Sequence, residues 1–378
     1  MAISLPATKR RIVFAIKAMS PAGGGAERVL AELSSALARR GHQVTVVSYD
    51  PPGTTDFFTL DDKVERLRLG IGSTHHSSSA RETLSRMVAL RRAVVRLGPD
   101  VAVGFMHSLY IPLGLALRGS GIPVIGGDHI VYEHFQTRPL ESALLRVVPL
   151  VCRKITAVSA AARASYPAWL QRMMEVVPNP VAAPSGVRAD PAGGTSKTLL
   201  CVGRLAAQKD HATLISAFAR IAPGFPEWSL RIVGDGELRE PLAAQIAALN
   251  LAQRVALPGP AADVGAELRR AQLFVLPSLY ESFGLVTAEA LAYGLPVIGF
   301  ADCQGTNELV ISGVNGLLVG SNDRIGSLAE GLARLMGDPA ERTRMGAAAP
   351  GTVAAFAPDE VAARWEQLIE LSLFSARR

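Results

Sequence analysis

The sequence predicts an α/β protein with two parallel sheets, each covered by helices on both faces. Short runs rich in valine, isoleucine and leucine alternate with helical segments along the 378-residue chain, as in a parallel sheet built from strand–helix–strand units. The alternation stops at a proline-, glycine- and alanine-rich stretch, residues 178–197, and then resumes. A chain of this length usually exceeds one hydrophobic core, so we expect two domains joined by this stretch.

Five strands are expected before that stretch and five after it. Residues 26–37, which follow the first strand, have apolar side chains at helical spacing, and Gly41 is placed to end that helix. The expected strands are RIVFAIKAM (11–19), HQVTVVSYD (42–50), DVAVGFM (100–106), IPVIGG (122–127), KITAVS (154–159), TLLCVGRL (198–205), SLRIVGDG (229–236), RVALPG (254–259), LFVLPSL (273–279) and GLPVIGF (294–300).

The expected domains are residues 1–180 and 195–356, both Rossmann-like. A final helical segment, 357–378, is expected to cross back to the first domain. Two such sheets would face each other across a cleft. Ligands of open parallel sheets bind at the carboxyl ends of the strands, so functional motifs should directly follow strands.

Composition favours a globular protein in a reducing, cytoplasmic setting. Hydrophobic residues make up 49% and charged residues 19%, with no low-complexity tract. The three cysteines form no CxxC pair, so neither a disulfide framework nor a cysteine zinc site is predicted. The N-terminus lacks the apolar run of a secretory signal, and residues 101–127 are interrupted by proline, glycine, histidine and arginine.

Positive charge is concentrated in the first half of the chain. Residues 1–180 have a net charge of +9 and residues 181–378 a net charge of −3. This asymmetry suggests that the first half faces an anionic partner. A general bias toward arginine in the proteome is the alternative explanation. Nucleic acid is disfavoured because only 6% of residues are aromatic and no known binding module is present.

The segment LYESFGLVTAEALAYGLPVIG, residues 279–299, is the most informative motif. Glu281 directly follows an expected strand, Gly284 allows a tight turn, and a helix should start near Leu285 with Glu289 in its first turns. The free N–H groups and positive dipole at a helix start bind phosphate, whereas a carboxylate accepts hydrogen bonds from vicinal hydroxyls. A sugar, a phosphate and a ribose in one ligand would match this pattern.

Two further motifs follow the first strand of each domain. In VGRLAAQKDH, residues 202–211, Arg204 and Lys209 could bind a diphosphate and stabilise it as a leaving group; an ordinary solvated basic loop is the alternative. In GGGAER, residues 23–28, Gly24 and Gly25 place bare amides at a helix start, although a merely tight turn fits as well. The motif is not GxGxxG, which disfavours a nucleotide-dependent oxidoreductase.

Together these three motifs resemble those of the retaining glycosyltransferases of family 4, which have the two-lobed GT-B fold. GGGAERV, GRLAAQKDH and ESFGLVTAE occur in the family's order and spacing, and the resemblance extends from about residue 11 to residue 375. Residues 301–319 are similar to the family's donor-site segment. The resemblance implies that the first domain binds the acceptor and the second binds a nucleotide-sugar donor.

The resemblance also implies roles for individual residues. Arg204 and Lys209 would hold the donor diphosphate, Glu281 would lie near the transferred sugar, and Glu289 would bind the ribose hydroxyls. The remaining donor contacts would come from backbone groups of Phe283, Gly284, Leu285, Gly234, Gly24 and Gly25.

The resemblance implies that a histidine of the first domain lies in contact with the sugar. His129, which follows an expected strand, is at the matching position; a structural strand-end histidine is the alternative. His107 is a second candidate, and His107, Asp128 and Glu133 are the candidate acceptor residues. A histidine there could donate to a sugar hydroxyl or share developing charge.

The expected reaction needs neither a metal ion nor a cofactor. The sequence has no Asp-x-Asp, the metal-binding motif of the other large glycosyltransferase fold, and cationic side chains with a helix terminus would replace the metal. Retention would then proceed by attack of the acceptor hydroxyl on the same face as the leaving phosphate, because no convincing carboxylate nucleophile is evident.

The acceptor and donor are less well defined by the sequence. Residues 81–97 form a basic amphipathic segment, which could either lie on the inner face of an anionic membrane or pack on its own sheet. The first reading suits a glycan or lipid-linked acceptor in polysaccharide or lipopolysaccharide synthesis. DCQGTNE, residues 302–308, favours a UDP-linked hexose or N-acetylhexosamine. A nucleotide-sugar 2-epimerase and a non-catalytic nucleotide-sugar-binding protein remain alternatives.

Overall fold

A computed structural model shows that the chain forms two compact units. Unit 1 comprises residues 1–180 and 358–378, and unit 2 comprises residues 181–357. The structure describes residues 8–20, 24–72, 79–136, 138–184 and 186–374. Gly23 of the first glycine motif lies outside these ranges.

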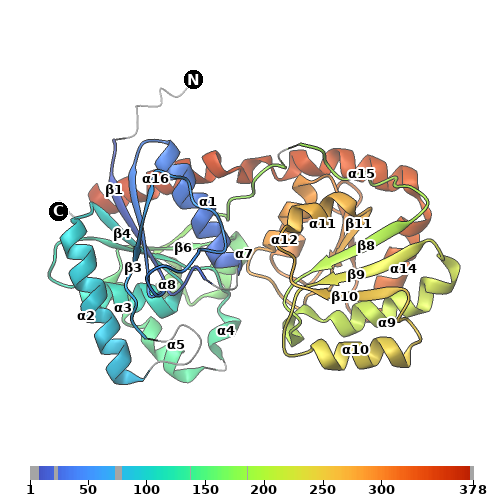
Figure 1. The fold of residues 1–378 in the computed structure, drawn as a ribbon, viewed down its shortest axis with the longest axis horizontal. Helices are drawn as coiled ribbons and strands as arrows, with labels where there is room; N and C mark the ends of the chain where they lie inside the picture. The colour runs from blue at the N-terminus through green and yellow to red at the C-terminus, as the bar shows by residue number, and fades with distance from the viewer. Residues whose placement is uncertain (1–7, 21–23, 73–78, 137, 185, 375–378) are drawn as a thin grey trace. The chain divides into compact units, whose positions relative to one another are not determined.

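Unit 1 contains a seven-stranded parallel sheet in the order β3-β2-β1-β4-β5-β6-β7, with helices on both faces (Figure 1). Its strands are β1 Arg11–Ile16, β2 Gln43–Ser48, β3 Val64–Arg68, β4 Val101–Phe105, β5 Val124–Gly127, β6 Lys154–Ala157 and β7 Met174–Val176. Its helices are α1 Gly25–Arg39, α2 Ala80–Leu97, α3 His107–Leu117, α4 Glu133–Gln136, α5 Pro139–Leu145, α6 Val148–Val151, α7 Ala160–Ser165, α8 Ala168–Gln171 and α16 Pro358–Phe374.

Unit 2 contains a six-stranded parallel sheet in the order β10-β9-β8-β11-β12-β13. Its strands are β8 Lys197–Val202, β9 Trp228–Val233, β10 Val255–Gly259, β11 Leu273–Leu276, β12 Val297–Phe300 and β13 Gly316–Val319. Its helices are α9 His211–Ile221, α10 Arg239–Ala248, α11 Val264–Arg270, α12 Leu285–Ala292, α13 Thr306–Leu309, α14 Arg324–Gly337 and α15 Pro339–Thr352, with 3-10 turns η1 Ala207–Lys209, η2 Ala222–Gly224 and η3 Ala354–Phe356. The predicted α/β fold with two parallel sheets is therefore confirmed.

Three strands were not predicted from the sequence: β3, β7 and β13. All three lie at the edge of a sheet. Strand β3 (VERLR) buries only its first residue, β7 is three residues long, and β13 is a four-residue run beginning with glycine. An edge strand has one neighbour and needs no continuous apolar run, which explains why the pattern gave no signal.

Each sheet has one switch point, at which successive strands lie on opposite sides of a central strand. In unit 1, β1 has β2 on one side and β4 on the other; in unit 2, β8 lies between β9 and β11. Ligands of open α/β sheets bind outside the carboxyl ends of the strands at such a switch point. The loops after β1 and β4, and after β8 and β11, are therefore the positions where a binding site is expected.

The C-terminal helix α16 packs on unit 1, as predicted. Trp365 is buried with its ring centroid 6.3 Å from that of Phe14 and 6.4 Å from that of Phe105. The helix is also held by ion pairs from Glu370 to Arg10 and from Glu366 to Arg40, each 2.7 Å long. Unit 1 thus depends on a helix that the chain reaches only after completing unit 2.

Replacing Trp365 with alanine should therefore destabilise unit 1. The truncation removes a large buried ring and leaves a cavity, so we expect a loss of about 3–5 kcal/mol in the free energy of unfolding, measured by urea denaturation followed by circular dichroism. Leu371→Ala, on an exposed position of the same helix, is the matched control and should change this free energy by about 0.5 kcal/mol or less. Equal effects of the two substitutions would contradict the packing role of α16.

Among the described residues, none of the helices combines the length and the hydrophobicity that crossing a bilayer requires.

Candidate functional site

Unit 2 brings Lys209 and Glu281 together at the switch point of its sheet. Strands β8 and β11 pair in parallel, so the loops that follow them emerge at the same edge. Lys209 Nζ lies 2.5 Å from Glu281 Oε1, and the Ser278 hydroxyl donates to the same oxygen at 2.6 Å. Glu281 is only 8% exposed, so the pair is a partly desolvated ion pair with an additional hydrogen bond.

The two loops that carry this ion pair are hydrogen-bonded to each other. The Leu279 amide donates to the Gln208 carbonyl at 2.9 Å, and the Gln208 side chain donates to the Tyr280 carbonyl at 2.7 Å. These bonds connect the β8–α9 loop to the β11–α12 loop at the residues that directly precede Lys209 and Glu281. The positions of Lys209 and Glu281 are thus fixed by backbone contacts as well as by their own charges.

Arg324, which was not predicted from the sequence, contacts a residue of each of these two loops. Its guanidinium donates to the Pro277 carbonyl at 2.6 Å, pairs with Asp210 at 3.0 Å, and lies 3.6 Å from the centre of the Phe300 ring. Asp210 itself has a left-handed backbone (φ 48°). Nothing in the sequence around Arg324 indicates this role, whereas Ser278, directly after a strand, could have been suspected.

Helix α12 begins at Leu285, as predicted, and its N-terminus lies directly after Glu281. Gly284 caps it with φ 78° and ψ 50°, a left-handed conformation that favours glycine. The first turn contains no acidic residue and has no side-chain cap, so its N–H groups are available to an anion. Phe283 is buried with its ring against Phe356, at a centroid distance of 5.3 Å.

Glu289 is a buried residue of helix α12. It lies four residues after the start of α12, is 4% exposed and has an interaction partner in the protein. The structure places Glu289 on the same helix as the anion-binding turn but does not test its predicted role.

The loops after β9 and β12 complete this edge of unit 2. Gly234 has φ 144°, and a Cβ there would lie 2.0 Å from the Gly203 carbonyl oxygen; at Gly305, φ 78°, a Cβ would lie 2.7 Å from the Glu281 carbonyl oxygen. Both glycines allow backbone segments to touch. Arg204 is exposed on the β8–α9 loop, and its guanidinium forms no ion pair with any described residue, which leaves its charge available to a ligand.

In unit 1, His129 follows β5 and is a half-buried, neutral histidine. Its ring stacks on Phe105 at 4.8 Å, Nδ1 lies 3.1 Å from Asn179 Oδ1, and burial lowers its pKa to about 4. Because the Asn179 oxygen accepts a hydrogen bond, Nδ1 carries the proton and Nε2 presents a lone pair. Nε2 is buried and has no partner among the described residues, so it can accept a hydrogen bond from a ligand hydroxyl.

Asp128 precedes His129 and has the opposite shift. Its Oδ2 accepts a hydrogen bond from the Tyr166 hydroxyl at 2.6 Å, Oδ1 has no partner among the described residues, and burial raises its pKa to about 7. Glu133, the first residue of α4, likewise has a buried oxygen, Oε2, with no partner in the described part of the chain. The structure thus groups the candidate residues Asp128, His129 and Glu133 after one strand.

The remaining first-unit candidates have partners within unit 1. Gly24 caps α1 and Gly25 begins it, but the carboxylate of Glu27 accepts hydrogen bonds from the backbone at this helix start, and burial raises its pKa. A donor phosphate would have to displace that carboxylate. His107 begins α3, and its Nε2 lies 3.1 Å from Glu141 Oε2.

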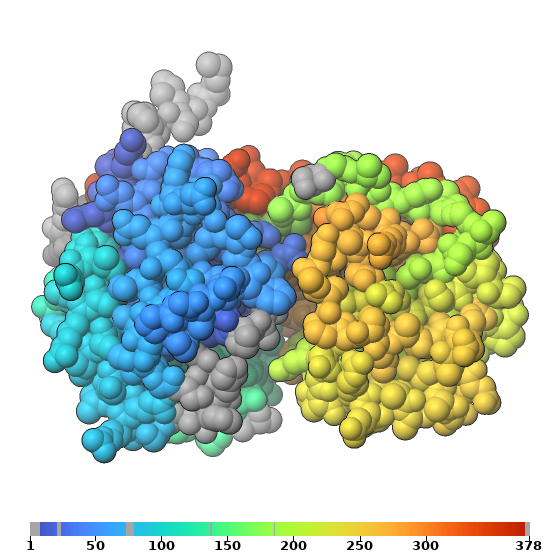
Figure 2. Space-filling model, viewed as in Figure 1, coloured from blue at the N-terminus to red at the C-terminus, as the bar shows by residue number. Residues whose placement is uncertain are grey.

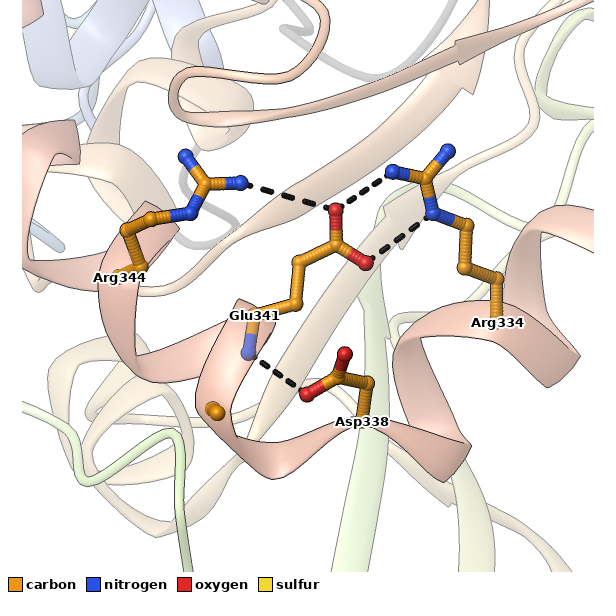
Figure 3. A pocket seen from close by; sticks show the side chains of 5 residues that line it. Arg334, Asp338, Glu341 and Arg344 are labelled. Atoms are coloured by element: carbon orange, nitrogen blue, oxygen red, sulfur yellow. Dashed lines mark hydrogen bonds and ion pairs between the residues drawn. The ribbon is translucent and has the colours of Figure 1, made fainter.

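One hollow on the surface of unit 2 contains none of the predicted site residues. It is lined by Arg334, Asp338, Ala340, Glu341 and Arg344 and has a volume of about 570 Å³ (Figure 3). Glu341 pairs with Arg334 at 2.6 Å and with Arg344 at 3.6 Å, and its amide donates to Asp338. Because these groups satisfy one another at the junction of α14 and α15, the hollow is a structural feature of that junction.

Family models match both units. A model described as "Glycosyltransferase Family 4" matches residues 23–183, and one described as "Glycosyl transferases group 1" matches residues 188–352. The chain belongs to glycosyltransferase family 4. The matched ranges contain the glycine motif after β1, the Arg204–Lys209 loop and the Glu281–Glu289 segment.

The chain is similar to two curated relatives whose names refer to an exopolysaccharide or to a glycan. An exopolysaccharide phosphotransferase of Streptomyces coelicolor is 40% identical over 52% of the chain, but the chain spans only 20% of that protein's length. An alpha-1,4-N-acetyl-D-galactosaminyltransferase of Campylobacter jejuni, whose name includes a glycan on PP-undecaprenol, is 25% identical over 83% of the chain and 86% of its own length.

The GT-B fold is confirmed by solved structures of other glycosyltransferases. HepE from Anabaena, solved in complex with UDP and glucose, aligns with a TM-score of 0.74 over 96% of the chain and 99% of its own length, at 20% sequence identity. At this identity the likeness concerns the fold alone.

The raised pKa of Asp128 predicts a pH-dependent stability of this glycosyltransferase. In an unfolded chain the carboxyl has a pKa of about 3.9, and in the folded protein about 7. Between these values the native state holds the proton more tightly, so its stabilisation is complete below about pH 4 and is lost as the pH rises to about 7, on the order of 1 kcal/mol per pH unit.

The measurement is the difference in free energy of unfolding between the wild type and Asp128→Asn across this pH range. We expect this difference to fall as the pH rises, because the amide cannot titrate. His129, whose shift has the opposite sign, is present in both proteins and cancels. A difference that stays constant from pH 4 to pH 7 would show that Asp128 is not protonated in the native state.

Proposed function

We propose that the protein transfers a hexose or N-acetylhexosamine from a UDP-sugar to a hydroxyl of a glycan or lipid-linked acceptor, with retention of configuration. One observation carries this proposal. At the switch point of unit 2, a lysine, a buried carboxylate and an uncapped helix N-terminus lie on adjoining loops. This combination offers positive charge to a diphosphate and a hydrogen-bond acceptor to the adjoining sugar.

The diphosphate binds at the start of α12 and between Arg204 and Lys209. In the unliganded protein the Lys209 charge is balanced by Glu281. A diphosphate would attract Lys209 and release Glu281 to accept hydrogen bonds from sugar hydroxyls. The amides of Phe283, Gly284 and Leu285 contact the phosphates, Glu289 contacts the ribose, and the turn at Gly234 approaches the base.

In the reaction, the bond between the anomeric carbon and the diphosphate oxygen breaks, and a bond to the acceptor oxygen forms on the same face. The acceptor proton passes to the departing phosphate oxygen. Arg204, Lys209 and the α12 dipole stabilise the negative charge that develops on the diphosphate, so the proposed reaction requires no metal ion or cofactor.

Unit 1 binds the acceptor in this proposal. At neutral pH His129 is uncharged and the buried Asp128 is only partly ionised, because their pKa values are about 4 and about 7, which suits a neutral hydroxyl group better than an anion. Nε2 of His129 accepts a hydrogen bond from a sugar hydroxyl, and Asp128, Glu133 and His107 lie on the acceptor side. The Campylobacter relative named for a PP-undecaprenol-linked glycan supports an acceptor of that class.

Helix α2 gives unit 1 a basic surface suited to a membrane-bound acceptor. Leu84, Val88 and Val95 are exposed by 62%, 42% and 45%, and the exposed arginines of the helix are Arg81, Arg91, Arg92 and Arg96. The helix lies on the surface in cyan (Figure 2). Only Arg86, Leu90 and Val94 are buried, so one stripe of the helix packs on the unit and another faces solvent. The exposed stripe is the part that would contact an anionic membrane in this proposal.

A nucleotide-sugar screen tests the donor class. A ligand at about one hundred times its Kd stabilises the folded state by about 2.7 kcal/mol, so the matching UDP-sugar should raise the melting temperature by several degrees. NAD is the matched negative control, because it shares a diphosphate and ribose but needs the GxGxxG motif that this chain lacks. A shift with NAD and none with any nucleotide sugar would overturn the proposal.

Substitutions at Lys209 and Glu289 separate turnover from donor binding. Lys209→Ala should lower kcat by roughly a hundredfold or more, because it removes charge that stabilises the leaving diphosphate, whereas Glu289→Ala should mainly weaken donor binding. Lys197→Ala is the matched control: Lys197 begins β8 at its amino end and pairs with Glu227. Transfer rates unchanged by both Lys209→Ala and Glu289→Ala would contradict the site.

A further inference from the structure

Three metal-binding side chains meet on unit 1, apart from the residues proposed to bind the donor. They are His107 at the start of α3, His134 in α4 and Glu141 in α5. One ligand atom from each lies within 4.8 Å of the others. Two imidazoles and one carboxylate are the ligand types of zinc sites that keep an open position, so the cluster differs from an ordinary surface group of acids.

The distances in the cluster already approach those of a coordinated ion. His107 Nε2 lies 3.1 Å from Glu141 Oε2, and His134 Nε2 lies 3.4 Å from the same oxygen. With metal–ligand distances of 2.0–2.2 Å, two ligand atoms of a tetrahedral zinc ion are about 3.3 Å apart. Two of the three distances therefore match, and the distance between the two histidine ligand atoms is at most 4.8 Å.

We propose that His107, His134 and Glu141 bind a divalent transition-metal ion of the zinc type, with water at the fourth position. The side chains of His107, His134 and Glu141 are 13%, 31% and 38% exposed, so the ion has access from solvent while one ligand is held in the protein. The three buried cysteines take no part in the cluster. Calcium and magnesium, which prefer oxygen ligands, do not match this set.

The backbone before His107 supports a functional role for the cluster. Met106 has φ 69° and ψ 150°, a conformation that is costly for a residue with a branched or long side chain and is usually retained where function requires it. It directs the chain from the end of β4 into α3, so that His107 is the first helical residue. The ion would join the start of α3 to α4 and α5 at the carboxyl edge of the sheet.

Arg138 opposes metal binding in the structure. Its guanidinium donates to His134 Nδ1 at 3.1 Å and to the His134 carbonyl at 2.8 Å. A histidine that accepts at Nδ1 carries its proton on Nε2 when neutral, and Nε2 is the atom that must bind the metal. Binding therefore moves the proton to Nδ1 and releases Arg138, which is 46% exposed and can swing into solvent. Removal of this arginine should strengthen metal binding.

The test uses the full chain without a tag, freed of metal with a chelator and titrated with Zn²⁺ by calorimetry. Co²⁺ replaces Zn²⁺ in a parallel titration followed by visible absorption, which reports a tetrahedral nitrogen–oxygen site. We expect one ion per chain. His134→Ala and Glu141→Gln should each weaken Zn²⁺ binding roughly tenfold or more, since even residues behind the ligands change affinity by that amount, whereas Arg138→Ala should tighten it.

Glu133→Gln is the matched control, because Glu133 is the neighbour of His134 on α4 but lies outside the cluster. It should bind Zn²⁺ like the wild type. Wild-type affinity in both His134→Ala and Glu141→Gln, or no binding of Zn²⁺ at micromolar concentrations by the wild type, would overturn the site. If His134→Ala does not fold, Glu141→Gln decides, because the amide preserves the shape of the side chain. These outcomes do not depend on nucleotide-sugar binding, so the two proposals fail separately.

Discussion

The contact between Lys209 and Glu281 depends on the pairing of β8 with β11, and the rest of the unit 2 site depends on that contact. The two residues are 72 positions apart, and only parallel pairing of neighbouring strands brings their loops to one edge. A carboxylate with 8% exposure cannot remain charged without partners. Lys209 and Ser278 supply them, and Arg324 holds the loop from the other side. The positive charge of Lys209 is therefore held in an ion pair, which the proposed diphosphate would replace.

The candidate site residues of the two units differ in charge. In unit 2 the charges at the sheet edge are retained: Arg204 is exposed, Lys209 is paired, and the first turn of α12 is uncapped by side chains. In unit 1 burial suppresses charge, lowering the pKa of His129 and raising that of Asp128. In the proposed reaction, an anionic leaving group favours positively charged surroundings, whereas a neutral acceptor hydroxyl favours uncharged ones. This is the difference between donor and acceptor units that we expect for a member of family 4.

The net positive charge of the first 180 residues lies partly on a helix that is only loosely buried. Helix α2 has three buried side chains in 18 residues, one of them Arg86, so its other four arginines and several of its apolar residues face solvent. The acidic residues of α16 neutralise a different part of the unit, through Arg10 and Arg40. The exposed basic surface on α2 is thus separate from the arginines that pair with α16.

The sequence by itself determined the two parallel sheets, the start of α12 and the motifs at the strand ends. Buried central strands require continuous apolar runs, a left-handed turn favours glycine at Gly284, and the carboxyl-edge rule places Lys209 and Glu281 at one edge of the sheet. The role of Arg204 in the same site stays a prediction. Tertiary structure alone decided the edge strands β3, β7 and β13, the bonds of Ser278 and Arg324, the contact of His129 with Asn179, and the meeting of His107, His134 and Glu141. These features depend on which side chains lie opposite one another after packing, and local periodicity carries no information about such long-range neighbours.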